Sequence, residues 1–413
     1  MKNTFTSNGQ KVVKNKYYKK DRKLRIHWNS NAVFAHSGYG TQSNLIVYGL
    51  LKAGFPIAHT AFYGLQGFPI VLDGLKIYPV IANTWGTDAM IFHSKDWNAD
   101  VNISYQDVWP LDDNMMKEVK NWIPLTMVDS EPVNPGILQR LRWARNILVP
   151  AQFAKDQLSS KGYNSTIIHH GVDTDIYKPM DKKECLKTFG LPEGRFIFGS
   201  VAANKDNPPR KSFQEMFDAF VKFKTVHPEA AMFMQTQMGN PAGFPIKEYL
   251  KYVGIENDVF FVDDYSSMYK LDSLSMAKLF NCFDCLLMPS QSEGFGLPLV
   301  EAQACGVPII THDWTTMPET IIEGKTGYSV KTAYKRWTSG NNFFAVPDVD
   351  DILAKMHLIY NADRKQMATD AREHMLKKYD FTNVLLPKWI DFLEGIEKEL
   401  YPVLTQNKTD IKI

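Results

Sequence analysis

Short apolar runs rich in β-branched residues alternate with segments of helical periodicity from Lys23 onward. Such alternation is typical of a parallel β-sheet whose faces are covered by helices. It occurs twice along the chain, on either side of the polar, proline-terminated segment 171–179. The pattern therefore predicts an α/β protein with two Rossmann-like domains, each built on a parallel sheet.

The individual elements follow from these runs. A helix that begins at Phe213 carries apolar residues at intervals of three and four, so one of its faces should cover the second sheet. Residues 331–350 contain glycine, asparagine and proline and are expected to form a loop. Helices are expected at 350–378 and 383–400, and strands at 24–29, 56–63, 101–107, 123–129, 146–150, 166–170, 196–202, 230–236, 258–263, 285–290 and 307–313.

The length of 413 residues is too great for one hydrophobic core and fits two domains with short extensions. We expect a basic, flexible tail at 1–22, a first domain at 23–175, a second at 176–382 and a C-terminal segment at 383–413. Ligands of such sheets bind at the carboxyl ends of the strands, which for paired domains is the cleft between them. The functional site is therefore expected in that cleft.

Charge and composition exclude several classes of partner. The net charge of +2 provides no global field for a nucleic acid or an anionic bilayer. The basic stretch 1–25 is interpreted as a solvated tail, and a weaker alternative is a contact for a phosphate-rich acceptor. No run approaches the roughly 18 apolar residues of a spanning helix, and no secretory signal is seen, so a cytoplasmic protein is expected.

The four cysteines are expected to be buried, reduced thiols. Cys282 and Cys285 are spaced like half of a zinc or redox site. Neither Cys185 nor Cys305 forms a second close pair, so a zinc site would lack two ligands. No metal site is predicted.

The most informative segment is SEGFGLPLVEAQACGVPII, at residues 292–310. Gly294 and Gly296 flank Phe295 and allow the backbone to turn tightly beside a ligand. Pro298 stands where a helix begins, a position that tolerates its missing amide hydrogen. The amides between Phe295 and Leu297, at the start of this helix, would therefore point at the cleft. A helix N-terminus of this kind is a natural site for a diphosphate.

Two glutamates bracket this turn. Glu301, expected in the first turn of the helix, should lean toward the cleft and accept hydrogen bonds from two ribose hydroxyls. Glu293, on the turn before the helix, is placed to meet the sugar beyond the diphosphate. In the alternative interpretation Glu301 complements the helix dipole and Glu293 is a solvated loop residue, which explains each residue alone but not the whole constellation.

This segment resembles the two-glutamate signature of retaining glycosyltransferase family four, a group 1 family with the GT-B fold. Weaker resemblance extends to SGYG at 37–40, HHGVDTDIYKP at 169–179 and PETIIEGKTGYSV at 318–330. The resemblance implies two facing Rossmann-like domains, a nucleotide-sugar held mainly by the second, and a final helix that returns to the first. It also implies retention of anomeric configuration without a metal or other cofactor.

The resemblance also implies basic residues after the first strand of the second domain, which neutralise the leaving diphosphate. Lys211 matches the family lysine. Ala202 and Ala203 stand where the family has a glycine and an arginine, so we propose that Arg210 supplies the guanidinium. In the alternative interpretation both residues lie on a solvated loop.

The first domain contributes three segments to the expected acceptor side. Gly38 and Gly40 precede a helix expected to open near Thr41, and the family resemblance implies that their backbone lies under the diphosphate and sugar. Tyr39 would line the acceptor channel, together with Asp107 and Trp109 from the loop 105–112. Asp129 stands where the family has a histidine and would bond the transferred sugar or help to take the acceptor proton; alternatively, Asp129, Ser130 and Asn134 are turn and cap residues.

The resemblance thus implies a hexosyltransferase in which the departing phosphate oxygen helps to remove the acceptor proton. Uridine diphosphate glucose is the donor expected from its frequency in the family. The acceptor is left open among a glycan, a lipid, a protein, a small molecule and a modified DNA base. Asp173 and Asp175 match the Asp-x-Asp motif of metal-dependent transferases but lie in the interdomain linker, where the family uses them for turns.

Two other functions are compatible with the same residues. One is an epimerase or hydrolase acting on the nucleotide-sugar, because the fold alone does not define the reaction. The other is an inactive sugar- or nucleic-acid-binding relative, against which the presence of Glu293, Glu301 and Lys211 argues. A Rossmann oxidoreductase is disfavoured because no Gly-x-Gly-x-x-Gly turn with a downstream acid is present.

Overall fold

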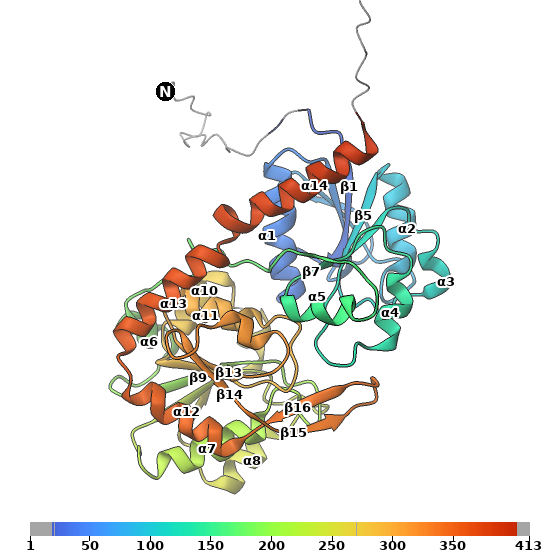
Figure 1. The fold of residues 1–413 in the computed structure, drawn as a ribbon. Coiled ribbons are helices and arrows are strands. Elements are labelled where there is room, and N and C mark those ends of the chain that lie inside the picture. The colour runs from blue at the N-terminus through green and yellow to red at the C-terminus, as the bar shows by residue number, and fades with distance from the viewer. Residues whose placement is uncertain (1–18, 20, 270, 403–413) are drawn as a thin grey trace, which may run out of the picture.

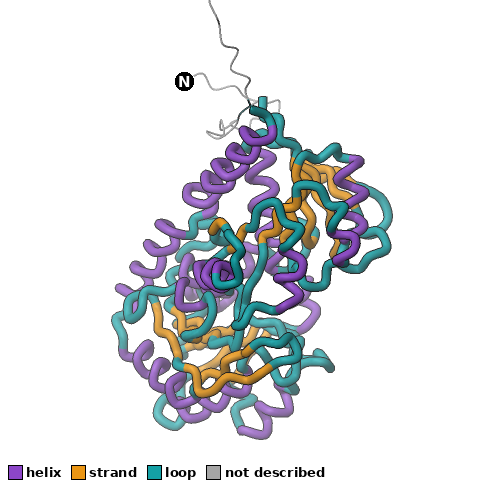
Figure 2. Tube along the Cα trace, turned by 45° about the vertical axis from the view of Figure 1, so that its right-hand side comes forward, coloured by secondary structure: helices purple, strands orange, loops and turns teal. Residues whose placement is uncertain are grey.

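The computed structural model describes residues 19, 21–269 and 271–402, which form two α/β domains side by side (Figure 1). In each domain the strands gather into a central sheet with helices around it (Figure 2). The predicted fold class, two domains with largely parallel sheets, is confirmed.

The first sheet has eight strands in the order β3-β4-β2-β1-β5-β6-β7-β8. Every neighbouring pair is parallel except β3 and β4. All five residues of β5 are buried, as expected of a strand covered on both faces. The strands are β1 (Ile26–Asn31), β2 (Ile57–Tyr63), β3 (Ile70–Leu72), β4 (Leu75–Tyr78), β5 (Val101–Tyr105), β6 (Trp122–Leu125), β7 (Leu148–Val149) and β8 (Thr166–Ile167), and the helices are α1 (Gly38–Lys52), α2 (Thr87–Asp96), α3 (Asp113–Met116), α4 (Pro135–Leu141) and α5 (Gln152–Ser159).

The second sheet has six parallel strands in the order β11-β10-β9-β12-β13-β14. The apolar face predicted for α7, at Phe213, Met216, Phe217 and Phe220, is fully buried against it. The strands are β9 (Ile197–Val201), β10 (Ala231–Gln235), β11 (Val259–Phe261), β12 (Cys285–Met288), β13 (Ile309–His312) and β14 (Gly327–Val330), and the helical elements are α6 (Lys182–Phe189), α7 (Phe213–Lys224), α8 (Ile246–Val253), α9 (Asp264–Tyr269), α10 (Ser273–Phe280), α11 (Leu297–Ala304), η1 (Met317–Thr320), α12 (Val349–Asn361) and α13 (Arg364–Lys378).

The loop predicted at 331–350 is wrong. β15 (Thr332–Trp337) and β16 (Phe343–Pro347) form an antiparallel hairpin there. Trp337 and Phe343 face each other across the strands with ring centroids 4.8 Å apart. Such aromatic cross-strand pairs stabilise a hairpin, and the glycine and asparagines that suggested a loop occupy only its turn.

The chain ends with a helix that crosses back to the first domain. Five residues of π-helix, η2 (Phe381–Leu385), lead into α14 (Leu386–Leu400), which lies beside α1 (Figure 1). Trp389 is buried against Trp28 with ring centroids 5.8 Å apart, inside the core of the first domain. The last helix is therefore part of that core.

The tail predicted at residues 1–22 is anchored at its end. Lys19 and Arg22 form ion pairs with Glu394 of α14 at 2.6 and 3.0 Å, and Arg22 is buried over the ring of Phe55. The end of the predicted tail, at Lys19 and Arg22, therefore contacts α14. Residues 1–18 and 20 lie outside the described residues.

All four cysteines are buried and free, as expected. Burial raises the pKa of the Cys282 thiol to about 12, which keeps it protonated at neutral pH.

Candidate functional site

The carboxyl ends of the strands in the first sheet face the second domain. The Ser292 hydroxyl donates a hydrogen bond to the backbone oxygen of Asp129. A Cβ added at Gly294 would lie 3.0 Å from Cβ of Met127, just after β6. The two-glutamate segment therefore packs directly against the first domain, where a ligand held by one domain would touch the other.

The turn before α11 has the predicted local geometry. Gly296 caps the helix in the left-handed region, with φ of 90°, and a Cβ there would lie 2.8 Å from the Leu299 side chain. Glycine is the residue that adopts this conformation without strain. Pro298 follows in the first turn of α11, so its missing amide hydrogen breaks no helical bond.

Glu293 lies at the centre of a buried charge cluster. Lys211 Nζ donates to Glu293 Oε1, and Arg210 Nη1 lies 3.5 Å from Oε2. Arg210 also donates to the backbone oxygen of Ser292. Both predicted cations are therefore brought to the glutamate that was expected to meet the sugar.

Burial and charge act against each other in this cluster. Burial alone raises the pKa of Glu293, but Lys211 and Arg210 overcome it and hold the pKa at about 2. Burial lowers the pKa of Lys211 and Arg210 adds to this effect, although Glu293 opposes both. We take Lys211 as charged, because its amine lies directly on an ionised carboxylate.

Two threonines that the sequence analysis missed hold the backbone of Glu293. The hydroxyls of Thr315 and Thr316 both donate to the Glu293 backbone oxygen at 3.0 Å. Thr315 adopts a positive φ of 54°, which is uncommon for this residue type. The loop after β13 thus supports the backbone of Glu293.

Glu301 lies in the second turn of α11, and the first-turn position predicted for it is wrong. The helix begins at Leu297, one residue before the proline, which moves Glu301 further along it. Its side chain is only 9% exposed. Burial raises the pKa of the carboxyl to about 7, against a partial lowering by a hydrogen bond from Tyr177. A ligand that donates hydrogen bonds to this carboxylate would remove that penalty.

Phe295 and Leu297 play different parts in the turn. The ring of Phe295 is buried against His170 and Tyr379, with centroids 4.9 and 5.8 Å away, so only its backbone is available to a donor. Leu297 is half-buried, and its Cδ1 would lie 3.2 Å from a Cβ at Gly38. The glycine loop of the first domain therefore touches the start of α11.

The helix predicted near Thr41 begins earlier, at Gly38. Ser37 caps it by accepting a hydrogen bond from the Gly40 amide at 3.0 Å. With the cap at Ser37, Gly38 and Gly40 both lie in the first turn of the helix. A Cβ at Gly40 would lie 2.2 Å from the backbone oxygen of Ala35, so no larger residue fits.

The acceptor-side candidates lie on adjoining loops of the first domain. The Tyr39 hydroxyl donates to Asp107 Oδ1 at 3.0 Å, and its ring packs on Tyr105. Burial and the charge of Asp129 raise the pKa of Asp107. Trp109 is 48% exposed, two residues further on.

Asp129 is held as part of a turn. Its Oδ1 accepts a hydrogen bond from Ser130 at 3.1 Å, and Asn134 caps α4 by accepting from the Gly136 amide. Asp129 contributes negative charge near Arg210 without a direct hydrogen bond among the described contacts.

The hairpin β15–β16 bridges the two domains, which the sequence analysis missed. Lys335 pairs with Glu131 at 2.7 Å, and Asn342 donates to the Ser130 hydroxyl at 2.7 Å. The Phe343 amide also donates to the Glu131 backbone oxygen. The alternation of residues 332–337 and the turn at 338–342 are the signal that could have indicated it.

Asp173 and Asp175 form a turn in the linker. The Asp173 carboxylate accepts hydrogen bonds from the amides of Asp175 and Ile176, and Thr174 donates to Asp380. Within the described part of the chain, no group of three or more histidine, cysteine, aspartate or glutamate side chains is arranged to hold a metal ion. No described helix is both long and apolar enough to cross a membrane.

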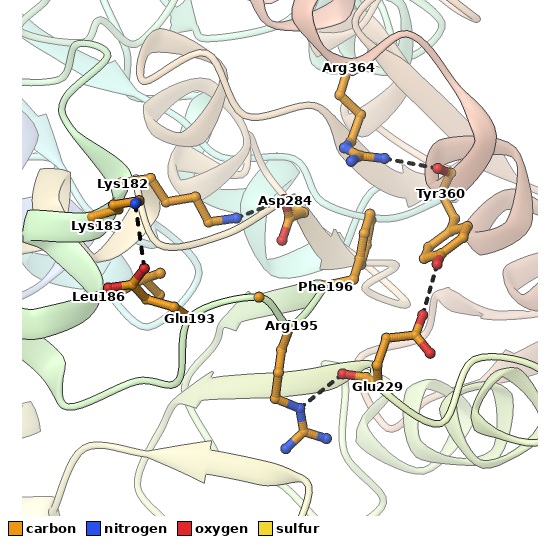
Figure 3. Close-up of a pocket in the computed structure, with 11 residues that line it drawn as sticks. Lys182, Lys183, Leu186, Glu193, Arg195, Phe196, Glu229, Asp284, Tyr360 and Arg364 are labelled. Atoms are coloured by element: carbon orange, nitrogen blue, oxygen red, sulfur yellow. Dashed lines mark hydrogen bonds and ion pairs between the residues drawn. The ribbon is translucent and has the colours of Figure 1, made fainter.

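A depression of about 580 Å³ lies elsewhere on the second domain (Figure 3). Its residue Asp284 immediately precedes β12, and Arg195 lies two residues before β9, so it opens at the amino-terminal edge of the second sheet. Lys182 pairs with Asp284 at 2.7 Å and Arg195 with Asp258 at 2.6 Å. Since these charges neutralise one another, we place the functional site in the cleft.

Comparison with known proteins finds similarity in the second domain. The model for glycosyl transferases group 1 matches residues 181–338. The D-inositol 3-phosphate glycosyltransferase of Mycobacterium tuberculosis is 27% identical over 161 residues, which are 39% of this chain and 32% of that protein. The chain thus matches about a third of the length of such curated relatives.

Solved structures resemble nearly the whole chain. Sucrose-phosphate synthase from Thermosynechococcus elongatus aligns with a TM-score of 0.70 at 15% identity, over 92% of this chain and 99% of that one. A glycosyltransferase from Rickettsia africae aligns with a TM-score of 0.69 at 16% identity, over 92% and 99%. Anabaena HepE, in complex with UDP and glucose, aligns with a TM-score of 0.67 at 13% identity, over 90% and 100%.

Two Rossmann-like domains in the arrangement of these structures define a GT-B fold. The second domain is similar to the group 1 glycosyltransferases over residues 181–338.

Proposed function

We propose that the chain transfers a hexose from a nucleoside diphosphate donor to a hydroxyl acceptor, with retention of anomeric configuration and without a metal ion. The observation that carries the proposal is the cluster of Glu293, Lys211 and Arg210 beside the start of α11. It combines a carboxylate for the sugar with two cations for a diphosphate, in a buried site. UDP-glucose is the proposed donor, in line with the UDP and glucose bound by HepE.

Each end of the donor has a separate partner in this proposal. Glu301 accepts hydrogen bonds from the two ribose hydroxyls, which compensates the cost of its buried charge. The diphosphate lies against the N-terminus of α11 and the side chains of Lys211 and Arg210. Glu293 bonds the sugar and, through its ion pairs, holds both cations in position.

The reaction breaks the bond between the anomeric carbon and the leaving phosphate oxygen, and forms a bond to the acceptor oxygen on the same face. The acceptor proton passes to the departing phosphate, so the chain needs no strong base. Positive charge from Lys211 and Arg210 stabilises the leaving group, and each donor contributes on the order of 3 kcal/mol in a dry site. Asp107 and Asp129 orient the acceptor hydroxyl.

The test is a thermal-shift screen over UDP-, GDP- and ADP-linked hexoses, followed by analysis of products. A donor that binds only the folded state raises the melting temperature. We expect a shift with one donor, unchanged turnover in excess EDTA, and a product with the anomeric configuration of the donor. Strict dependence on manganese or magnesium would contradict the mechanism, and donor cleavage without transfer to any acceptor would indicate a hydrolase.

A further inference from the structure

Five loops follow strands β1, β2, β4, β5 and β6 at the cleft edge of the first sheet, and we call them the cleft-edge loops. They comprise residues 32–37, 64–69, 79–86, 106–112 and 126–134. None of them contains a lysine or an arginine, whereas they carry the acids Asp107, Asp112, Asp129 and Glu131. This side of the cleft is therefore acidic, although the chain as a whole is nearly neutral.

The cations at the cleft are supplied from the opposite side. The positive charges that act on Asp107 come from Arg210 and Lys205, both of the second domain. Lys335 of the hairpin is paired with Glu131. A phosphate or carboxylate on an acceptor bound to the cleft-edge loops would meet like charge and no guanidinium or amine from these loops.

The same loops expose large apolar and aromatic side chains. Trp85 and Trp109 are 39% and 48% exposed, with ring centroids 6.3 Å apart and an angle of 50° between the planes. The Gln106 amide donates to the Trp85 backbone oxygen at 3.1 Å, so the two loops are held together beside Asp107. Other exposed members of the set are Phe34, Phe68 and Ile81.

Exposed aromatic faces next to carboxylates suit one class of ligand. A pyranose ring presents C–H groups on its face and hydroxyls at its edge. The face stacks on an indole ring, whose π-surface is negative, and the hydroxyls donate to carboxylates. A polyanion would need cations that the loops lack, and a lipid chain would place its methylenes against carboxyl groups such as that of the half-buried Asp107.

We propose that the acceptor is an uncharged carbohydrate, whose ring beside the reacting hydroxyl stacks on Trp85 and Trp109, and that phosphorylated acceptors are rejected. This inference rests on the proposed transferase function, because it names the substrate of the same cleft. In this proposal the acidic cleft-edge loops discriminate against phosphorylated acceptors, and Trp85 and Trp109 provide affinity for the sugar ring.

The first experiment compares acceptors. Methyl glycosides and neutral oligosaccharides of glucose, galactose and mannose are incubated with the enzyme and its donor, in parallel with sugar 6-phosphates and an oligonucleotide containing 5-hydroxymethylcytosine. We expect kcat/KM for a neutral sugar to exceed that of its phosphate by at least about tenfold. Preference for a phosphate or the oligonucleotide, or transfer to no neutral sugar, overturns the proposal.

The second experiment uses Trp85→Ala and Trp109→Ala, with Trp143→Ala as a control. Trp143 is also exposed in the first domain but follows α4, outside the cleft-edge loops. We expect both cleft variants to raise the acceptor KM about tenfold. The donor KM and the release of nucleotide without acceptor should stay unchanged.

The results separate the two levels of the proposal. If the wild-type protein neither binds nor cleaves any nucleotide-sugar, the proposed function fails. If it cleaves donor but Trp85→Ala and Trp109→Ala keep the wild-type acceptor KM, the assignment of the acceptor site fails alone.

Discussion

Replacing Glu301 by glutamine measures the cost of keeping a carboxyl group buried in α11. Burial raises the pKa of this group from 4.5 to about 7. As the pH rises through 4.5, the unfolded carboxyl loses its proton while the folded one keeps it until about pH 7. The free energy of unfolding therefore falls across this window. Above pH 7 the accumulated penalty is about 3 kcal/mol.

Glutamine does not titrate, so the Glu301→Gln variant escapes this loss. We expect its stability relative to the wild type to increase by about 2.5 kcal/mol between pH 5 and pH 8. Urea unfolding at both pH values measures the change. Glu248→Gln is the control, because Glu248 is exposed on α8 and should give the same difference at both. A Glu301→Gln advantage that stays constant or shrinks toward pH 8 would refute the reasoning.

The same variant should bind the donor more weakly. In glutamine one of the two carboxylate oxygens is replaced by an NH2 donor, so two donating ribose hydroxyls must share a single, uncharged acceptor oxygen. We expect about a tenfold loss of donor affinity at pH 8. Wild-type affinity should fall as the pH drops below 7, whereas the affinity of the variant should not. If donor affinity had the same pH dependence in the wild type and the variant, Glu301 would not take part in donor binding.

Three further predictions concern other parts of the molecule. Lys211→Ala should lower kcat by roughly 100-fold because it removes a cation from the leaving group. Lys222→Ala, which changes an exposed lysine of α7, should keep the wild-type kcat. A Lys211→Ala variant with the wild-type kcat would show that Lys211 takes no part in the mechanism. Trp389→Ala should lower the free energy of unfolding by about 3 to 5 kcal/mol, since Trp389 of α14 is buried against the first domain. Lys398→Ala, a substitution at an exposed residue of the same helix, is the control and should not lower it in this way. Asn342→Ala breaks the bond to Ser130 and should lower stability by about 1 kcal/mol and increase the radius of gyration of the donor-free protein. No change in scattering would show that this bond is not needed to hold the domains together.

The sequence predicted the parts of this protein whose signals are local. The buried strands and the aromatic face of α7 follow from periodicity alone, and the turn at Gly296 follows from glycine and proline chemistry. Each depends on residues a few positions apart. Glu293, Lys211 and Arg210 were each singled out from the sequence, because the segments around them have a recognisable pattern, but their pairing with one another was not predicted.

Features that depend on tertiary contacts were not predictable in the same way. The hairpin β15–β16 is stabilised by cross-strand pairs and by contacts with the loop 129–134, which local propensity does not contain. Thr315 and Thr316 reach Glu293 across some 22 positions of sequence. Helix α1 begins earlier than predicted because Ser37 caps it. Helix α11 begins at Leu297, which places Glu301 in its second turn and not in the predicted first turn.

The most direct test of the central claim is the crystal structure of the protein in complex with UDP-glucose or, failing a bound sugar, with UDP. We predict that both ribose hydroxyls lie within hydrogen-bond distance of the Glu301 carboxylate, and that the diphosphate lies between the start of α11 and the side chains of Lys211 and Arg210. A nucleotide bound instead in the depression beside Lys182, or in the cleft with Glu293 and Glu301 turned away from it, would contradict the account.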